Sequence, residues 1–391
     1  MMKEEDTGEK DDKGNPKKRN VLWDAQAIQK KDDFTIVLNG KSPNVTLPEN
    51  LFHYQLAILH PDDKGVFKPG SIGTGAFTMT ENEVGRRQVL KAKPGYWGGG
   101  PYLDAIEFID VGDDVAAQIG ALASKQVDGL YRGGVTMLEP LKQIAHLARH
   151  EVDTAETAVA RMQGVAKPFD NPKVRQAMRL AIDVKLVSDI SLKGTGTPGE
   201  HHHVSKVHPD YAALAAPVRD VAKAKQLLAE AGYPNGIDIE IAAHGQFDWH
   251  PLAVQNMVEQ WKDAGIRCKI NLVPSDFYWQ NRLKFPFAFT VWAHRPLGVM
   301  TLPLAYRSGV AWNESKYANP ELDKLLTEAE GILDTAKRKV VMAKIEQIML
   351  DDGPLVLPAW MKVFTYMDKK VQGFKMHPTG FIFGHELAMG A

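Results

Sequence analysis

The sequence is poor in cysteine and in long apolar runs. Among 391 residues Cys268 is the one cysteine, which excludes an intrachain disulfide and a cysteine-rich zinc or iron–sulfur site. No stretch approaches the ~20 apolar residues that a membrane-spanning helix needs. Charge is balanced, because 47 Lys and Arg against 48 Asp and Glu leave a net charge of −1. Without a basic excess, nucleic acid is not an expected partner.

Catalytic signatures are also missing. The chain has no Gly-x-Ser-x-Gly elbow, no P-loop ending in Gly-Lys-Ser/Thr and no His-Glu-x-x-His. Cys268 lies in a predicted strand between Arg267 and Lys269, which favours a buried structural thiol over a nucleophile. We therefore expect no catalytic residue, no cofactor and no resident metal.

One cluster of histidines leaves several interpretations open. His201, His202 and His203 are consecutive, and His208 follows five residues later. Neutral imidazoles are good ligands for zinc, nickel or copper. Adjacent side chains on an extended segment point to opposite faces, however, so at most two of them could share one ion. A solvated loop, which could act as a lid, and a ligand contact through a single ring such as His203 are the alternatives.

The length predicts two or three domains, and the pattern is that of an α/β protein. Residues 1–20 are charged and broken by Gly and Pro, so we expect a flexible lead-in without the apolar h-region of a secretory signal. Alternating or β-branched runs predict strands at 33–39, 77–80, 87–92, 105–111, 237–243, 267–273, 287–293, 355–360 and 363–367. Helical periodicity and caps predict helices at 113–125, 171–193, 220–231, 251–264, 320–330 and 335–351. The β-α-β alternation between 235 and 293 indicates a mainly parallel sheet.

Aromatic side chains gather in the C-terminal half, near predicted strand ends and loops. They are Trp292, Trp312, Trp360, Tyr306, Phe277, Tyr278 and Trp279. Core packing explains many such residues, but amphipathic rings at strand ends are also what a cleft uses to hold a ligand with an apolar body.

Several segments together make the sequence recognisable. These are GTGAF at 73–77, KPGYWGGGPYLD at 93–104, ALASKQVD at 121–128, FDNPKVRQA at 169–177, AKAKQLLAEAGY at 222–233 and PLVLP at 354–358. In this order they resemble the extracellular solute-binding protein family 5. These are the peptide-, nickel- and oligosaccharide-type receptors of bacterial ABC importers.

The resemblance implies a periplasmic-binding-protein-like fold, in which two α/β lobes joined by a hinge close on a ligand. On that basis residues 21–155 and 354–391 would form the first lobe and 156–353 the second. Family members are usually longer, so the first lobe is expected to be incomplete, as in an N-terminally truncated protein. The resemblance also implies a periplasmic or extracellular location, a monomer, and ABC transporter permease subunits as partners.

The resemblance also identifies candidate ligand-binding residues, with one departure from the family pattern. Peptide receptors of this family typically carry a Trp-x-Ala-Asp type segment whose Asp pairs with the peptide's free amine. Here the stretch is VWAHRP at 291–296, and Arg295 stands where that Asp would be. A cation there repels an ammonium group, whereas the planar guanidinium suits a carboxylate, phosphate or sulfonate. The alternative is that Arg295 pairs with an Asp or Glu of the protein.

We therefore expect a non-catalytic receptor for a small organic solute that is peptide-like, opine-like or otherwise anionic. Trp292 and Trp360 would be stacking walls, Arg295 the anion clamp and His294 its hydrogen-bonding neighbour. Tyr306, Arg307 and His203 would be further contacts. A hydrolase on the same scaffold, with His294 as general base, is the alternative from another class. A truncated remnant without a transport role is the third.

Overall fold

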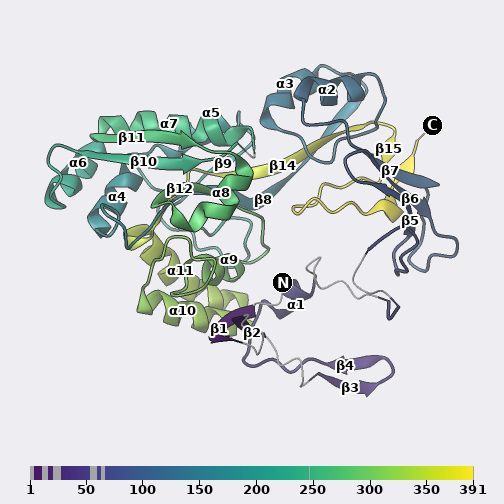
Figure 1. The fold of residues 1–391 in the computed structure, drawn as a ribbon, viewed down its shortest axis with the longest axis horizontal. Coiled ribbons are helices and arrows are strands. Elements are labelled where there is room, and N and C mark those ends of the chain that lie inside the picture. The colour runs from purple at the N-terminus through teal and green to yellow at the C-terminus, as the bar shows by residue number, and fades with distance from the viewer. Residues whose placement is uncertain are drawn as a thin grey trace. The chain divides into compact units, whose positions relative to one another are not determined.

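The structure is a computed structural model, and it describes residues 4–10, 16–20, 28–52, 60–62, 67–245 and 247–390. The chain divides into two compact units. Unit 1 comprises Met1–Ala57 and Ala155–Met361, and unit 2 comprises Ile58–Thr154 and Lys362–Ala391. Each unit is built from segments that are distant in sequence (Figure 1).

The centre of unit 1 is a mixed β-sheet with the strand order β11-β10-β12-β8-β14-β9, in which the short strand β13 also pairs with β8. Its strands are β8 (Leu147–Met162), β9 (Thr197–Pro198), β10 (Ile237–Ala243), β11 (Ile266–Leu272), β12 (Phe287–Trp292), β13 (Leu355–Val356) and β14 (Ala359–Asp368). The first part of β8, up to Thr154, and the last part of β14, from Lys362, belong to unit 2. Strand β10 is parallel to β11 and β12, as the β-α-β pattern predicts. Strand β12 then runs antiparallel to β8, so the sheet as a whole is mixed.

The helices of unit 1 are mostly those that the caps predict. They are α4 (Pro172–Leu180), α5 (Val184–Ser191), α6 (Val221–Glu230), α7 (Trp249–Asp263), α8 (Ser275–Asn281), α9 (Gly298–Tyr306), α10 (Pro320–Gly331) and α11 (Thr335–Asp352). Asp220 caps α6 by accepting a hydrogen bond from the Lys223 amide, and Asp334 caps α11 in the same way. The single helix expected over 171–193 is instead two helices, because the Asp183 side chain caps the Leu186 amide and starts a new helix there.

Burial explains why these elements pack as they do. All residues of β12 except Val291 are buried, as befits a strand covered on both faces. A large apolar cluster joins β12, α9, α10, α11 and the start of β14, and it includes Trp292, Leu302, Leu326, Ile345 and Trp360. This cluster is the core against which the candidate binding residues lie.

The N-terminal part of unit 1 differs from the sequence-based expectation. Strands β1 (Glu4–Lys10) and β2 (Pro16–Asn20) form an antiparallel pair within the stretch expected to be an irregular lead-in. The expectation rested on composition, which indicates how much apolar area a segment can bury. This strand pair is instead held by backbone hydrogen bonds, which composition does not reveal. The strand expected at 33–39 is a hairpin of β3 (Gln29–Asp32) and β4 (Thr35–Val37), with its turn at 33–34. Helix α1 (Leu47–Leu51) follows.

Unit 2 contains smaller sheets and short helices. Its elements are β5 (Phe77–Glu83), β6 (Arg87–Ala92), β7 (Ala105–Ile109), α2 (Val115–Ala123), α3 (Leu138–Lys142), β15 (Val371–Gln372) and β16 (Ala388–Met389), with 3-10 turns η3 (Val135–Met137) and η5 (Gly384–Glu386). The expected antiparallel pair is confirmed as β5 and β6, and β7 extends it to three strands. Asp114 caps α2 through the Ala117 amide.

The division into units differs in two places from the lobes expected at 21–155 with 354–391 and at 156–353. The first boundary falls at Thr154 and Ala155, but the second lies at Met361, because β13 and Trp360 belong to the sheet and core of unit 1. Residues Met1–Ala57 also belong to unit 1, where the Val45 amide donates to the Glu330 carbonyl at 2.8 Å. Within the described ranges, no helix is long and apolar enough to span a bilayer.

Candidate ligand-binding site

The candidate site begins where β12 ends, inside unit 1. Trp292 is the last residue of that strand and pairs with Thr157 of β8. The chain then passes through His294 and Arg295 before α9 begins at Gly298. Because β12 is a central, buried strand, its C-terminal end is held firmly, and side chains just beyond it are well placed to meet a ligand.

Three of the predicted residues surround His203. The ring centroid of His203 lies 5.7 Å from that of Trp292, 5.6 Å from Tyr306 and 5.9 Å from Trp360. All four side chains are buried, and the Tyr306 hydroxyl is hydrogen-bonded to His203 Nδ1 at 2.6 Å. The structure therefore brings His203, Trp292, Tyr306 and Trp360 together from four separate elements.

Two polar atoms in this aromatic cluster are buried without a hydrogen-bond partner among the described residues. They are His203 Nε2 and Trp360 Nε1. Burial lowers the pKa of His203 to about 3, so its ring is neutral near pH 7. When the Tyr306 hydroxyl donates to Nδ1, the imidazole hydrogen sits on Nε2 and both orphaned atoms are donors. Buried donors usually have partners, so these two call for an acceptor.

Arg295 lies against the same cluster. Its guanidinium carbon is 5.9 Å from the centre of the Trp292 ring, and Nη1 donates a long hydrogen bond of 3.4 Å to the Ala293 carbonyl. No Asp or Glu in the described part of the chain forms an ion pair with it. Burial lowers its pKa to about 10, so it keeps its positive charge near neutral pH. The alternative of a pairing within the protein therefore has no support in the described residues.

His294 is held by a main-chain contact. The Ala155 amide donates to His294 Nδ1 at 2.9 Å, which fixes the hydrogen of the neutral ring on Nε2. In that tautomer Nε2 is a donor and cannot accept a proton from water or a substrate. The geometry therefore disfavours His294 as the general base of a hydrolase. Cys268 is equally unsuited to catalysis, because burial raises the pKa of its thiol to about 12.

Arg307 is the predicted residue that the structure uses differently. Its Nη2 lies 2.8 Å from Glu330 Oε2, and the two form a largely buried ion pair. The Asn313 amide also donates to the Arg307 carbonyl at 3.0 Å. Arg307 is adjacent to Tyr306 in sequence, but its charge is neutralised by Glu330 and is not left for a ligand.

The segment around the consecutive histidines, residues 199–212, is called here the histidine loop. His201, His202, His203 and His208 are all at least 96% buried, so the loop is neither solvated nor a free lid. His201 Nδ1 accepts from the Leu357 amide at 3.0 Å, and His208 Nε2 contacts the Arg295 carbonyl at 3.0 Å. Among the described residues, no group of three His, Cys, Asp or Glu side chains is arranged to hold a metal ion.

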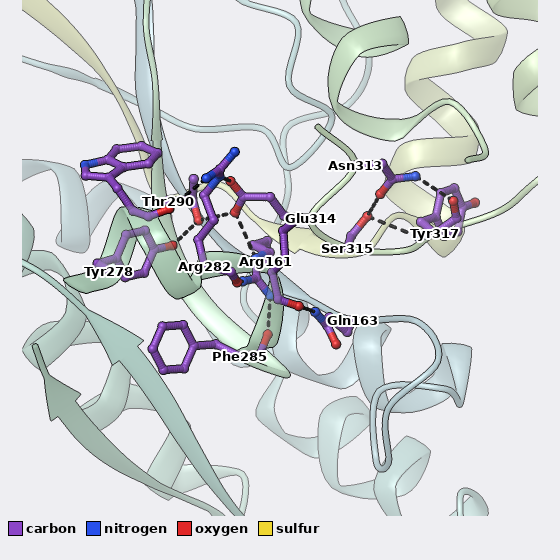
Figure 2. A network of polar contacts seen from close by, with 12 residues as sticks. Arg161, Gln163, Tyr278, Arg282, Phe285, Thr290, Asn313, Glu314, Ser315 and Tyr317 are labelled. Atoms are coloured by element: carbon purple, nitrogen blue, oxygen red, sulfur yellow. Dashed lines mark hydrogen bonds and ion pairs between the residues drawn. The ribbon is translucent and has the colours of Figure 1, made fainter. Parts of the chain in front are cut away.

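A second polar cluster contacts β12 through Thr290. We call it the glutamate network, and its members are Arg161, Tyr278, Arg282, Thr290 and Glu314. Glu314 accepts from Arg161 Nε at 3.1 Å and from the Thr290 hydroxyl at 2.8 Å, and it pairs with Arg282 at 3.1 Å. The Tyr278 hydroxyl contacts Thr290 in turn, as Figure 2 shows. This network ties β8 and β12 to the loop before α10.

Sequence reasoning missed the contacts that hold the site. His208 and Asp210, which touch the chain at Arg295 and Gly298, lie more than 85 residues away from those partners. The proximity of His208 to three other histidines was visible in the sequence, but its partner was not. Asp210 gave no local signal.

Comparison with solved structures identifies the class of fold. The fold matches solved structures of substrate-binding proteins, among them HbpA2 from Haemophilus parasuis, with a TM-score of 0.80, 21% identity and coverage of 95% of this chain and 76% of that one. The PBP AgaA in complex with agropinic acid from "A.tumefacien R10" matches with a TM-score of 0.78, 21% identity and coverage of 95% and 78%. The fold is thus that of the periplasmic binding proteins.

The family follows from sequence. The family model of the bacterial extracellular solute-binding proteins, family 5 Middle, matches residues 10–314, and the chain belongs to this family. Heme-binding protein A of Haemophilus influenzae is 24% identical over 385 residues, covering 91% of this chain and 68% of that protein. The glutathione-binding protein GsiB of Pectobacterium atrosepticum is 25% identical over 391 residues, covering 93% and 73%. The predicted family and fold class are therefore confirmed.

Proposed function

We propose that this protein captures a small anionic organic solute and delivers it to an ABC importer. The observation that carries the proposal is Arg295, a cation that no carboxylate of the described residues neutralises. A charged group in such surroundings is costly unless it is paired. A carboxylate, sulfonate or phosphate of a ligand would supply the missing partner, and the fork of the guanidinium can bind it through two hydrogen bonds.

The neighbours of Arg295 support the same chemistry. His203 Nε2 and Trp360 Nε1 are buried donors without partners among the described residues. Trp292 and Trp360, predicted as stacking walls, are buried in the apolar core beside Arg295, so on this proposal they back the site and the solute reaches them only by displacing part of what covers them. A site that offers donors and a cation selects an acceptor-rich ligand and disfavours a free ammonium group.

Glutathione is the first candidate ligand that we would test. It is a small peptide with two carboxylates and one ammonium group, so its glycine carboxylate, which is remote from the ammonium group, is the one expected at Arg295, and a relative that is 25% identical is named for binding it. Opine-like conjugates come next, since they also carry carboxylates. On this proposal the protein acts as a monomer outside the cytoplasm, has no catalytic role of its own, and its macromolecular partners are the permease subunits of the transporter.

A thermal-shift screen tests the proposal. The panel contains glutathione, dipeptides, opines, organic acids and neutral sugars, and the wild type is compared with Arg295→Ala. A ligand at a hundredfold its dissociation constant adds about 2.7 kcal/mol to the stability, enough to raise the melting midpoint by a few degrees. We expect acidic compounds to shift the wild type, and Arg295→Ala to weaken their binding about a hundredfold or more.

Arg267→Ala is the matched control, because Arg267 is also an arginine of unit 1 but is exposed and already paired with Asp238. It should bind like the wild type. Equal affinity of Arg295→Ala and the wild type for an acidic ligand would overturn the clamp. A cooperatively melting wild type that responds to neutral sugars and not to acids would overturn the anionic solute.

A further inference from the structure

The backbone that carries Arg295 rests on a turn of the histidine loop. His208 Nε2 is 3.0 Å from the Arg295 carbonyl oxygen, and Asp210 Oδ1 accepts from the Gly298 amide at 3.4 Å. The segment 295–298 is therefore anchored at both ends by residues only two positions apart in the chain.

The tautomer of His208 is fixed by a second contact. The Ser205 amide donates to His208 Nδ1 at 3.1 Å, so the neutral ring carries its hydrogen on Nε2 and donates it to the Arg295 carbonyl. His208 is buried, and this burial lowers its pKa to about 4. The charged or titratable groups that act on it or respond to it are Asp210, His202 and His203.

Asp210 fastens the turn to helix α11. Its Oδ2 pairs with Arg338 Nε at 3.0 Å, and both side chains are buried almost completely. Arg338 also donates to the Ile332 carbonyl at 2.7 Å, just before α11 begins. A buried, hydrogen-bonded ion pair of this kind is rigid, because breaking it would leave a charge buried alone.

Gly298 completes the contact. A Cβ atom at this position would lie 2.9 Å from the end of the Met342 side chain and 3.1 Å from that of Val204. The absence of a side chain thus lets the start of α9 come close to the histidine loop and to α11.

The Arg295 side chain has few restraints of its own. Its hydrogen-bond and ring contacts with described residues are the 3.4 Å hydrogen bond to the Ala293 carbonyl and the face of Trp292, and its charge also acts on His203. The direction in which the guanidinium points is therefore governed by the backbone that carries it, and that backbone is held by His208 and Asp210.

We propose that His208, supported by Asp210, is a positioning residue that aims the Arg295 guanidinium at the acidic group of the ligand. The inference rests on the proposed function and adds a residue that sets the preference for an anion without touching it. Preorganisation of this kind raises affinity because the bound geometry already exists in the free protein.

The test compares His208→Leu, which removes the donor, with His208→Gln, whose side-chain amide can still donate to the Arg295 carbonyl. Binding of glutathione and of its diethyl ester, in which both carboxylates are blocked and the ammonium group remains, is measured by calorimetry. We expect His208→Leu to weaken glutathione at least tenfold and to reduce the ratio of acid to ester affinity. His208→Gln should restore both to within about threefold of the wild type. A general loss of protein stability would lower the affinities for glutathione and for the ester by the same factor. The ratio of the two affinities therefore distinguishes a positioning role from a general loss of structure.

His244→Leu is the matched control, since His244 is another fully buried histidine of unit 1 and lies against Tyr278 and not against the 295–298 segment. It should leave the acid-to-ester ratio unchanged. Wild-type affinity and an unchanged ratio in His208→Leu overturn the positioning role while leaving the anion clamp intact. Wild-type affinity in Arg295→Ala overturns the clamp itself.

If the wild type does not bind glutathione, the position of the Arg295 guanidinium can still be tested by NMR in the protein without ligand. The NMR signal of the Arg295 guanidinium is assigned by its loss in Arg295→Ala, in protein labelled at arginine. We expect this signal to move or broaden in His208→Leu and to stay in place in His208→Gln. An unmoved signal in His208→Leu would contradict the proposal.

Discussion

The glutamate network contacts β12 through Thr290, and Arg295 follows the end of the same strand, yet the charges in the two regions are in opposite situations. At Glu314 both carboxylate oxygens are met, by Arg161, Arg282 and Thr290. Among the polar and ring contacts of the described residues, the Arg295 guanidinium has only the face of the Trp292 ring and a long hydrogen bond to the Ala293 carbonyl. A cluster whose groups satisfy one another stabilises the fold, whereas a cluster that lacks a partner is suited to receive one from outside.

The two regions also differ in the kind of polar group that holds them. The glutamate network is built on the ion pairs of Glu314, whereas the histidine loop combines one buried ion pair, Asp210 with Arg338, with four buried imidazoles. Charge pairs and neutral rings respond differently to mutation and to pH. The predictions below use this difference, beginning with the largest expected effect.

Acid should affect the histidine loop first. Burial lowers the pKa of His201, His202 and His203 to about 3 and that of His208 to about 4. The unfolded chain therefore binds more protons than the folded protein below the ordinary histidine pKa of about 6.5, and stability falls as pH decreases from there towards 4. Since all four histidines act in the same direction, their effects on stability reinforce one another as the pH falls.

Glu346 makes stability change with pH in the opposite direction. Burial raises its pKa to about 8, so its contribution to stability decreases as pH rises from about 4.5 to 8. Urea unfolding between pH 5 and pH 8.5 should thus show maximal stability near pH 6.5, with the steeper decline on the acid side. A stability that is constant between pH 7 and pH 5 would rule out neutral, buried histidines in the loop.

The next largest effect should come from Glu314→Leu. The substitution leaves Arg161, with its side chain 3% exposed, without its acidic partner. Breaking a buried pair by removing one partner costs about 3–5 kcal/mol. The midpoint of urea unfolding should fall accordingly, while Glu328→Gln, a change at an exposed acid of α10, should leave it in place. A small effect of Glu314→Leu would mean that the network relaxes around the loss.

A smaller effect is expected from Tyr306→Phe, on the side of the unsatisfied cluster. The change removes the hydroxyl that is hydrogen-bonded to His203 Nδ1 and leaves a buried polar atom without its partner. Such a loss costs about 1–3 kcal/mol. A thermal melt should show the decrease, and Tyr102→Phe, at a largely exposed ring of unit 2, should not. Equal melting of wild type and Tyr306→Phe would show that the hydroxyl contributes nothing to the position of His203.

Much of the fold could be predicted from sequence, because local signals mark these elements. The run IDIEIAA is bounded by turns and forms β10 over the predicted residues, and the Asp220 cap marks the start of α6. The long strand β8 was missed because its first half carries exposed charged residues while its second half is buried throughout. No single periodicity describes such a strand.

The candidate site could be predicted in its residue types but not in its contacts. The aromatic residues and Arg295 stood out by type and by family position, and His203, Trp292, Tyr306 and Trp360 do lie together. Whether an arginine has an acidic partner depends on tertiary structure. Arg307 is paired with Glu330, whereas Arg295 is not paired with any described acid, and one sequence cannot distinguish the two.

The smallest effect should come from a pair at the surface. Arg267 and Asp238 are opposite each other on β11 and β10, and Arg267 Nε and Nη2 each donate to an Asp238 oxygen at 2.7 Å. This bidentate contact has shorter distances than the contacts of Glu314 with Arg161 and Arg282, but the side chains are 53% and 76% exposed, so water and salt screen their attraction. We expect Arg267→Ala to leave the melting midpoint unchanged in 0.15 M salt and to lower it only at low ionic strength. A loss comparable with that of Glu314→Leu would show that geometry, and not burial, decides what an ion pair contributes in this protein.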